Sequence, residues 1–242
     1  MMAYQATFQR YESKYLLSKL QKAALLQEMQ PYMKLDAYGR TTIRNIYYDT
    51  PDYRLIRRSL EKPVYKEKLR IRSYQQVTPN DPVFVELKKK YRSIVYKRRL
   101  TVSEEQVMTC FRHGLPLPVQ SQIADEIAYF RAYYQKLEPA VFLSYEREAY
   151  YEIAGGEFRV TFDENILYRE QDFSLGSSIY GTPILQRGQT LMELKATGSL
   201  PLWMCHAFNR LHIYQTSFSK YGRAYQDGLQ KTKKQEEYSY VC

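Results

Sequence analysis

The sequence has 242 residues, and 36 lysines and arginines against 26 aspartates and glutamates give it a formal net charge of +10 at pH 7. A hydrophobic content of 44% with 10 glycines and 10 prolines excludes collagen-like and low-complexity chains. Three widely spaced cysteines argue against a disulfide framework, no apolar stretch is long enough for a membrane span, and the polar first residues argue against a signal peptide. We expect a globular cytoplasmic protein without a transmembrane segment, and the basic surplus predicts an anionic partner.

Eight segments have the β-branched and aromatic content and the alternation typical of β-strands. In chain order they cover residues 5–16, 41–49, 64–75, 82–90, 93–102, 141–152, 157–166 and 190–197. Gly155-Gly156 predicts a hairpin between two of them, and Asn80-Asp81-Pro82 separates another pair. Mostly antiparallel strands of this kind can close into a barrel or form an open sheet, and the residues themselves favour neither.

Five further segments have helical spacing or capping signals. Ser18 is a candidate N-cap for the first helix, and Ser103 with Gln106 predicts a capping box for a second, which Gly114 ends. The remaining helices are expected over 121–137, 201–213 and 219–231. With no internal repeat and no linker, we predict one α+β domain over residues 1–231 and a disordered polar tail over 232–242.

Basic residues recur at every second position of several predicted strands, which places them on one strand face. One face of the strand at 64–75 consists of Lys66, Lys68, Arg70 and Arg72, and the next two strands carry Lys88, Lys90, Lys97 and Arg99 in the same way. A half-exposed antiparallel strand would explain any one case. Because like charges on neighbouring strands repel, the repetition favours an anion held between them.

The motifs of several enzyme classes are missing from the sequence. It has no phosphate-binding P-loop, no dinucleotide fingerprint and no zinc-like histidine spacing, and Cys110 and Cys205 lie in apolar helical patterns. Phosphoryl transfer needs only arginine, lysine and carboxylates that hold Mg²⁺ or Mn²⁺. Glu12, Glu86 and Glu193 are the candidate metal ligands, with Glu193 favoured; for Glu12 and Glu86 a charge-balancing ion pair is an equal alternative.

Eight short segments follow one another along the chain: ESK, KLRIRSY, FVELKKK, SIVYKRRL, SYEREAY, FRVTFDENI, LMELK and SKYGRAY. Through these segments and their order, the chain resembles the VTC domain over about residues 8–226. This domain is a polyphosphate polymerase module of the triphosphate tunnel superfamily and also exists as stand-alone bacterial proteins. The resemblance implies an α+β fold in which an eight-stranded antiparallel β-barrel tunnel, lined by basic residues and flanked by helices, binds triphosphate and polyphosphate.

The same resemblance implies roles for individual residues. The implied catalytic residues are positively charged: Lys14, Arg70, Arg72, Lys88, Lys97, Arg147 and Arg159. Lys220 would bind substrate from the closing helix, and the alternation adds Arg10, Lys68, Lys90, Arg99 and Lys195 to the substrate-binding set. Glu193 is the implied metal ligand. A single Glu12 before Lys14 departs from the acid-rich opening strand of the triphosphatase branches, which favours the polymerase branch.

The resulting hypothesis is a polyphosphate polymerase that uses Mn²⁺ or Mg²⁺ to transfer the γ-phosphate of ATP to a growing polyphosphate chain. Its expected partners are ATP and polyphosphate rather than nucleic acid, and the sequence identifies no protein partner. One alternative is a metal-dependent triphosphatase, and another is a non-catalytic module that binds polyphosphate or nucleic acid. The faces predicted to point inward hold 13 bases and five acids, Asp49 and Asp163 among the latter, which would put most of the surplus charge inside the tunnel.

Overall fold

The computed structural model describes residues 11–92 and 94–229. They form two compact units. Unit 1 takes in the described residues up to Thr41 with Tyr145–Asn165 and Leu185–Phe218, and unit 2 takes in Thr42–Ser144, Ile166–Ile184 and the described residues from Ser219 on. The prediction of a single domain over 1–231 stays a prediction, and the predicted tail at 232–242 lies outside the described residues.

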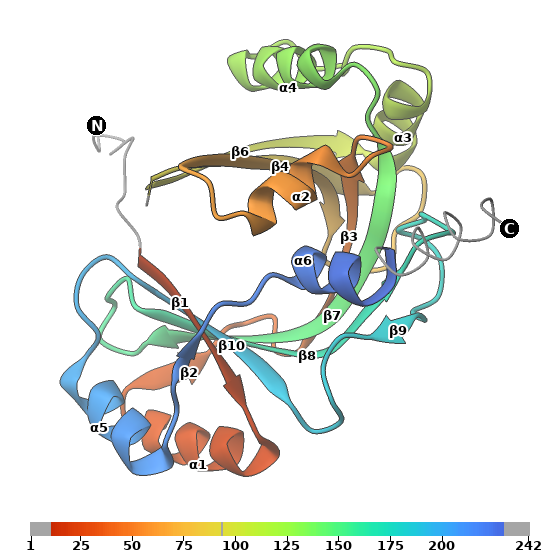
Figure 1. The fold of residues 1–242 in the computed structure, drawn as a ribbon. Helices are drawn as coiled ribbons and strands as arrows, with labels where there is room; N and C mark the ends of the chain where they lie inside the picture. Colours follow the sequence, from red (N-terminus) through yellow and green to blue (C-terminus); the bar gives the residue numbers. More distant parts are fainter. Residues whose placement is uncertain (1–10, 93, 230–242) are drawn as a thin grey trace, which may run out of the picture. The chain divides into compact units, whose positions relative to one another are not determined.

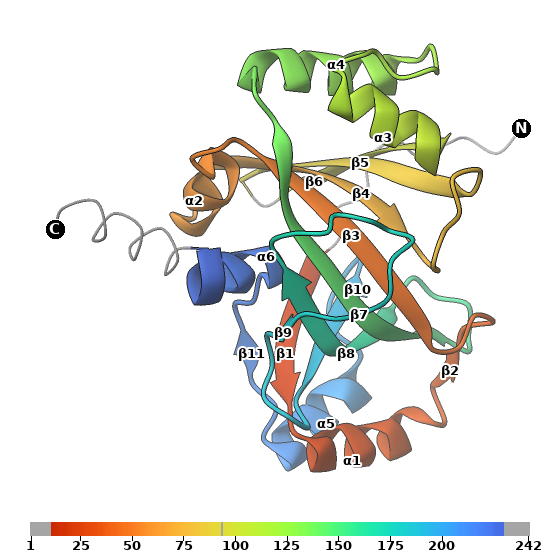
Figure 2. The ribbon, with the colours of Figure 1, turned by 90° about the vertical axis from the view of Figure 1, so that its right-hand side faces the viewer.

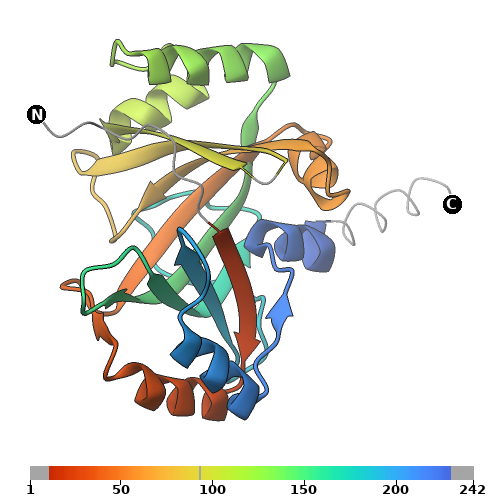
Figure 3. The same cartoon turned by 90° about the vertical axis from the view of Figure 1, so that its left-hand side faces the viewer.

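The sheet of unit 1 has the hydrogen-bonded order β11-β1-β10-β8-β7, and β2 pairs with β7. The strands are β1 Tyr11–Leu17, β2 Met33–Leu35, β7 Glu138–Glu152, β8 Arg159–Arg169, β10 Thr190–Ala196 and β11 Gln215–Thr216, of which β7 and β8 continue into unit 2. Figure 3 shows β1 between β10 and the short β11. Both of these ladders are antiparallel, as the sequence predicts.

One face of this sheet forms the core of unit 1. Met192 and Leu194 of β10 lie opposite Phe162 and Val160 of β8, and all four are buried. Helices α1 (Lys19–Met29) and α5 (Leu202–Leu211) lie side by side and pack on this face (Figure 1). Ser18 caps α1 in the predicted way, because its side chain accepts from the Gln21 backbone and the Gln21 side chain accepts in return.

The sheet of unit 2 has the order β7-β3-β4-β5-β6, and the short β9 pairs with β8. Its own strands are β3 Thr41–Asp49, β4 Tyr65–Ser73, β5 Pro82–Tyr91, β6 Ile94–Ser103 and β9 Thr182–Pro183. Helices α3 (Glu104–Arg112) and α4 (Gln122–Tyr134) pack against the apolar face of β4–β6 (Figure 2). Two more helices, α2 (Arg54–Leu60) and α6 (Lys220–Ala224), the latter running into a π-helical turn over Tyr225–Leu229, complete the unit.

The antiparallel sheet with flanking helices is confirmed, and each of the eight predicted strands has a counterpart of seven or more residues. Three shorter strands, β2, β9 and β11, are additional. Among the described residues, the hydrogen-bonded order ends at β11 and β6 with no ladder between these two, so the predicted barrel is not closed by strand pairing.

One local prediction is wrong, and one helix was missed. Ser103 is the N-cap residue of α3, but its side chain makes no capping bond and lies 2.9 Å from the Gln106 carboxamide oxygen instead, so there is no capping box. Helix α2 was not predicted. Its N-cap residue, Tyr53, has a left-handed backbone and caps no helical N–H with its side chain; Thr50 and Asp49, which precede it in the chain, accept from the first-turn amides instead. In the part of the chain that the structure describes, none of the helices combines the length and apolarity that crossing a membrane requires.

Candidate anion-binding site

The polar face of β4–β6 in unit 2, called here the cationic face, carries eight bases and one acid. They are Lys66, Lys68, Arg70 and Arg72 on β4, Glu86, Lys88 and Lys90 on β5, and Lys97 and Arg99 on β6. The alternating residues Leu69, Ile71, Val85 and Leu87 are fully buried on the opposite face. The predicted alternation therefore holds in these strands, because burying the apolar side chains on the core fixes where the bases point.

Three lysines of the cationic face form one row across neighbouring strands. Lys68 pairs in register with Lys88, and Lys88 with Lys97. The next row pairs Lys66 with Lys90. Like charges directly opposite one another destabilise a sheet, and the lysine row contains no carboxylate. An anion lying along the row would remove this repulsion.

Glu86 lies in the adjacent row, between Arg70 and Arg99 in register, and is 1% exposed. One carboxylate oxygen accepts from Arg70 Nε at 2.8 Å, and the other accepts from Arg99 Nε at 2.8 Å and lies 2.7 Å from Lys97 Nζ. Burial would raise the pKa of this carboxyl, but Arg70, Arg72 and Lys97 outweigh burial and hold the pKa far below its ordinary value. The ionised Glu86 therefore fixes the surrounding cations in place.

Two tyrosines extend this network, and the sequence analysis missed both. Tyr47 on β3 pairs in register with Arg70, and its hydroxyl accepts from the Arg70 guanidinium at 2.8 Å. The Tyr74 hydroxyl accepts from Arg99 at 2.8 Å. Burial opposes ionisation of Tyr47, but Arg70, Arg72 and Lys68 prevail and lower its pKa from 10.0 to about 8. The alternation of residues along β3 predicts the strand face on which Tyr47 lies. Its pairing with Arg70 depends on the register between β3 and β4, which the alternation does not give.

This pKa makes stability depend on pH in a defined direction. Between pH 8 and 10 the Tyr47 hydroxyl is ionised in the folded chain and protonated in the unfolded one, so its contribution to stability is complete above pH 10 and is lost as the pH falls through 8. We expect the wild type to gain about 2 kcal/mol relative to Tyr47→Phe between these pH values. Urea denaturation of both proteins across this range measures the difference. Two results together would exclude the shift in pKa. The wild type and the variant would show the same dependence of stability on pH, and the wild type would show no tyrosinate absorbance near pH 8 beyond that of the variant.

The sequence places Asp49 among the acids predicted to point into the tunnel. In the structure, Asp49 does not line the cationic face. It is fully buried and accepts from the backbone N–H of Leu55 at 2.8 Å and of Ile56 at 3.0 Å. The Tyr221 hydroxyl of α6 also donates to it, at 2.8 Å. Asp49 thus caps amides in the first turn of α2 and ties α6 to this helix.

The polar face of unit 1 contains a second charged group, called here the Glu193 cluster. It consists of Glu12 and Lys14 on β1, Arg147 on β7, Asp163 on β8 and Glu193 on β10. Glu193 lies 3.7 Å from Lys14 Nζ through one oxygen and 3.4 Å from Arg147 through the other. Arg147 also makes bidentate contacts of 2.5 and 2.6 Å with Asp163, and Lys14 Nζ lies 3.7 Å from Glu12.

Two buried polar atoms beside this cluster lack a hydrogen-bond partner among the described residues. Thr161 Oγ1 is on β8, directly opposite Glu193 in register, and Arg159 Nε is opposite Lys195. Leaving a buried donor or acceptor unsatisfied costs about 1–3 kcal/mol, so such atoms indicate where a polar ligand belongs. The Glu193 cluster with Arg159 and Lys195 contains four bases and three acids, so the basic surplus is concentrated on β4–β6 rather than shared by all the strands.

The three candidate metal ligands are divided between the two units. Glu86 belongs to unit 2 and is enclosed by cations, whose positions a metal ion would have to take. Glu12 and Glu193 both approach Lys14 Nζ at 3.7 Å, so two carboxylates converge on one positive charge. This pair, beside the unsatisfied Thr161 hydroxyl, fits a small divalent ion that takes its other ligands from phosphate and water. Within the described ranges, no group of three or more metal-ligating side chains occurs.

A model of the VTC domain matches residues 9–227. The chain belongs to the VTC domain family. No curated protein matches it. Among solved structures, a Bacillus halodurans protein provisionally named an adenylate cyclase aligns with a TM-score of 0.57 at 16% identity, over 89% of this chain and 96% of that chain.

Two further structures align less well. One is a Vibrio parahaemolyticus protein, also provisionally named an adenylate cyclase, with a TM-score of 0.46, 13% identity and coverage of 89% of this chain and 96% of that one. The other is a chain of the Schizosaccharomyces pombe Mediator head module, with a TM-score of 0.42, 12% identity and coverage of 84% and 90%. The likeness in fold rests on the Bacillus halodurans structure, because the other two TM-scores are too low to carry an argument.

In this VTC domain the predicted site residues separate into two groups. Arg70, Arg72, Lys88, Lys97, Lys68, Lys90 and Arg99 share the cationic face, and Lys14, Arg147, Arg159 and Lys195 belong to unit 1 with Glu12 and Glu193. Lys220 begins α6, whose N-cap Ser219 lies 3.2 Å from Lys68 Nζ. Arg10 lies outside the described residues. The catalytic and binding roles of these residues stay predictions.

Replacing Lys88 by alanine tests the lysine row of this VTC domain. We expect tripolyphosphate affinity to fall by about tenfold or more, since one charged contact is worth about 1.5–3 kcal/mol. Titration calorimetry measures the affinity, and urea denaturation verifies that the variant folds. Lys89→Ala is the matched control, because Lys89 points to the other face and lies 3.6 Å from Glu126; equal losses of affinity in both variants would contradict an ordered row.

Proposed function

We propose that this VTC domain is a metal-dependent polyphosphate polymerase that transfers the γ-phosphate of ATP to the end of a polyphosphate chain. The observation that carries the proposal is the cationic face, where eight bases surround a single buried carboxylate and three lysines stand in one row. A linear polyanion matches such a row in charge and in shape, and membership in the VTC family supports the same substrate class.

The cationic face would bind and orient the phosphates. Arginine guanidinium groups make paired contacts with phosphate oxygens, whereas lysines act as point charges. Glu86 leaves one terminal nitrogen of Arg70, Nη1, to other partners, because it contacts Arg70 through Nε and Nη2. Held in this way, the arginines lose little conformational freedom when a phosphate binds.

The reaction needs charge neutralisation and alignment more than acid–base chemistry. The terminal oxygen of the acceptor phosphate is already anionic at neutral pH, so no general base has to remove a proton. The bond between the γ-phosphorus and the bridging β–γ oxygen breaks, a bond from the acceptor oxygen to that phosphorus forms, and ADP leaves. Cations that are already in position lower the barrier, because neither solvent nor side chains have to reorient as charge shifts among the phosphate oxygens.

Glu193 with Glu12 would hold the Mn²⁺ or Mg²⁺ ion, with Lys14 and Arg147 on either side of the Glu193 carboxylate. When bound, the ion neutralises phosphate charge and orients the oxygens for in-line attack. Lys14 and Arg147 each lie within ion-pair distance of the Glu193 carboxylate, Asp163 fixes the orientation of Arg147, and Thr161 offers its hydroxyl to the same region.

Incubating the purified chain with ATP and Mn²⁺ or Mg²⁺ tests the proposal, with polyphosphate length measured on gels and free phosphate measured in parallel. We expect long polyphosphate and ADP. Free phosphate without polyphosphate would identify the triphosphatase alternative. Tripolyphosphate binding without any turnover would identify the non-catalytic binding module. Lys88→Ala should reduce polymer formation and Lys89→Ala should not, which links the activity to the cationic face.

A further inference from the structure

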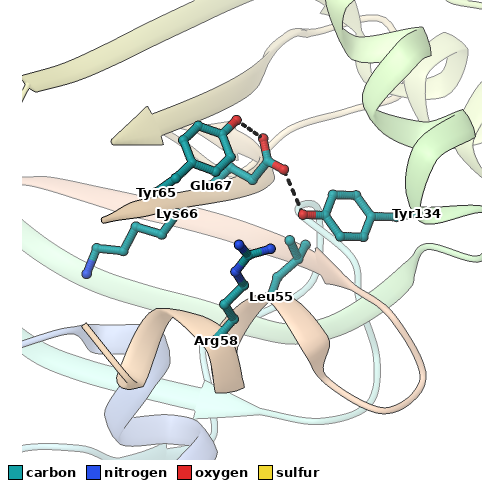
Figure 4. A pocket seen from close by; sticks show the side chains of 6 residues that line it. All are labelled: Leu55, Arg58, Tyr65, Lys66, Glu67 and Tyr134. Carbon is teal, nitrogen blue, oxygen red and sulfur yellow. Dashed lines mark hydrogen bonds between the residues drawn. The ribbon is translucent and has the colours of Figure 1, made fainter. Parts of the chain in front are cut away.

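A pocket of about 280 Å³ lies in unit 2 on the side of β4 that faces away from the cationic face. Tyr65 and Glu67 of β4 form its floor, and the adjoining deeper part is bordered by Arg58 of α2 and Tyr134 of α4 (Figure 4). Successive side chains of a strand point to opposite faces, so Glu67 is directed away from the side that Lys68 occupies. None of the residues that line this pocket belongs to the cationic face. Only the small adjoining hollow is also bordered by a residue of that face, Lys66 (Figure 4).

The outer wall of the pocket is aromatic and open to solvent. Tyr129 and Tyr133 of α4 line it, are 70% and 52% exposed, and stack on one another with ring centroids 6.4 Å apart. Tyr133 in turn meets Tyr134 edge to face at 4.9 Å. Two exposed rings, four residues apart on one helix and bordering a pocket, provide a surface on which a planar group can stack.

The floor of the pocket provides one strong acceptor and one cation. Both Glu67 oxygens already accept from tyrosine hydroxyls, from Tyr65 at 2.6 Å and from Tyr134 at 2.7 Å (Figure 4). A carboxylate oxygen has a second lone pair, so each can accept one further donor. Arg58 extends from α2 into the same space, and among the described residues its side chain makes no hydrogen bond or ion pair.

We propose that this pocket binds a purine nucleoside monophosphate. The base would stack on Tyr133 and Tyr129, an amino or ribose hydroxyl group would donate to Glu67, and the phosphate would pair with Arg58. The volume is near the lower end for ligand pockets, which suits one mononucleotide. An aromatic pocket with a carboxylate can also hold an organic cation, but Arg58 and Lys89 border this one and would repel it. The site goes beyond the proposed polymerase reaction and gives the chain a second place for a nucleotide.

Calorimetric titration of AMP and of adenosine into the full chain tests the proposal. Saturating tripolyphosphate occupies the cationic face, and a chelator removes divalent metal. AMP should still bind. Tyr133→Ala should weaken AMP and adenosine by about tenfold, the range expected for one lost stacking partner. Arg58→Ala should weaken AMP to a similar extent and leave adenosine unchanged, because adenosine has no phosphate. Lys88→Ala should change neither.

Several results would overturn the proposal. They are loss of AMP binding when tripolyphosphate is present, AMP affinity that neither pocket variant changes, and displacement of AMP by choline. Tyr133 and Arg58 are both exposed, so both variants should fold, and thermal unfolding verifies this. The outcome does not depend on polymerase activity: AMP can bind here in a chain that makes no polyphosphate, and a polymerase can lack this site.

Discussion

Glu86→Gln is expected to lower the free energy of unfolding of the ligand-free protein by about 3 kcal/mol at neutral pH. Removing one partner of a buried ion pair costs about 3–5 kcal/mol, because the remaining charge is left uncompensated. The lower value applies here, since Lys97 and Arg99 keep 44% and 34% of their side-chain surface exposed to solvent. Glutamine has the same size, so the loss reports charge and not packing. Urea denaturation of both proteins measures it.

Tripolyphosphate should restore part of this stability. An anion on the cationic face supplies negative charge beside Arg70, Arg99 and Lys97, so the ligand should raise the midpoint of unfolding more in Glu86→Gln than in the wild type. Glu105→Gln, on the exposed surface of α3, is the matched control and should change stability by only a few tenths of a kcal/mol. If Glu86→Gln is as stable as the wild type without ligand, the carboxylate does not hold the cations together.

The faces of the strands could be predicted from the sequence, but the pairing of strands could not. Alternation alone places Lys68, Lys88 and Lys97 on polar faces, because their neighbours Leu69, Leu87 and Leu100 must be buried. Whether the three lysines stand opposite each other depends on register, which the connections between β4, β5 and β6 determine. A shift of two residues would preserve every face and remove the row.

The roles of the carboxylates were the least predictable part of the candidate site. In the sequence, Glu86 is a carboxylate near Lys88, equally suited to a metal or to an ion pair. Its partners Arg70, Lys97 and Arg99 come from the strands on either side. Asp49 ends a predicted strand and by parity could point inward, yet the uncapped first turn of α2 takes up its oxygens. For Glu86 the deciding contacts come from other strands, and for Asp49 they come from helix amides six and seven residues further along the chain, so neither set follows from the alternation of one strand.

Glu193→Gln is expected to reduce polyphosphate synthesis by about 100-fold or more, the range seen when a group that stabilises developing charge is removed. A neutral amide binds Mn²⁺ or Mg²⁺ more weakly than a carboxylate, so a higher metal concentration should recover part of the activity. Tripolyphosphate affinity in the absence of metal should not fall, because the cationic face is unaltered. Folding should persist, because Arg147 keeps its bidentate contact with Asp163. Turnover as a function of metal concentration, with tripolyphosphate titration in parallel, measures all of this.

The matched control is Glu148→Gln on β7, a half-buried carboxylate of unit 1 that lies 2.9 Å from Lys22 and has no proposed role in the reaction. It should retain turnover and its metal dependence. The contrast separates a metal ligand from a charge-balancing residue, because both substitutions remove one negative charge from an ion pair. If Glu193→Gln retains turnover with an unchanged metal requirement, Glu193 only balances Lys14 and Arg147. The proposed metal ion would then have to be held by Glu12 and the phosphates themselves. Loss of Glu12 should in that case be the more damaging substitution, because Glu12 would be the one carboxylate that holds the ion.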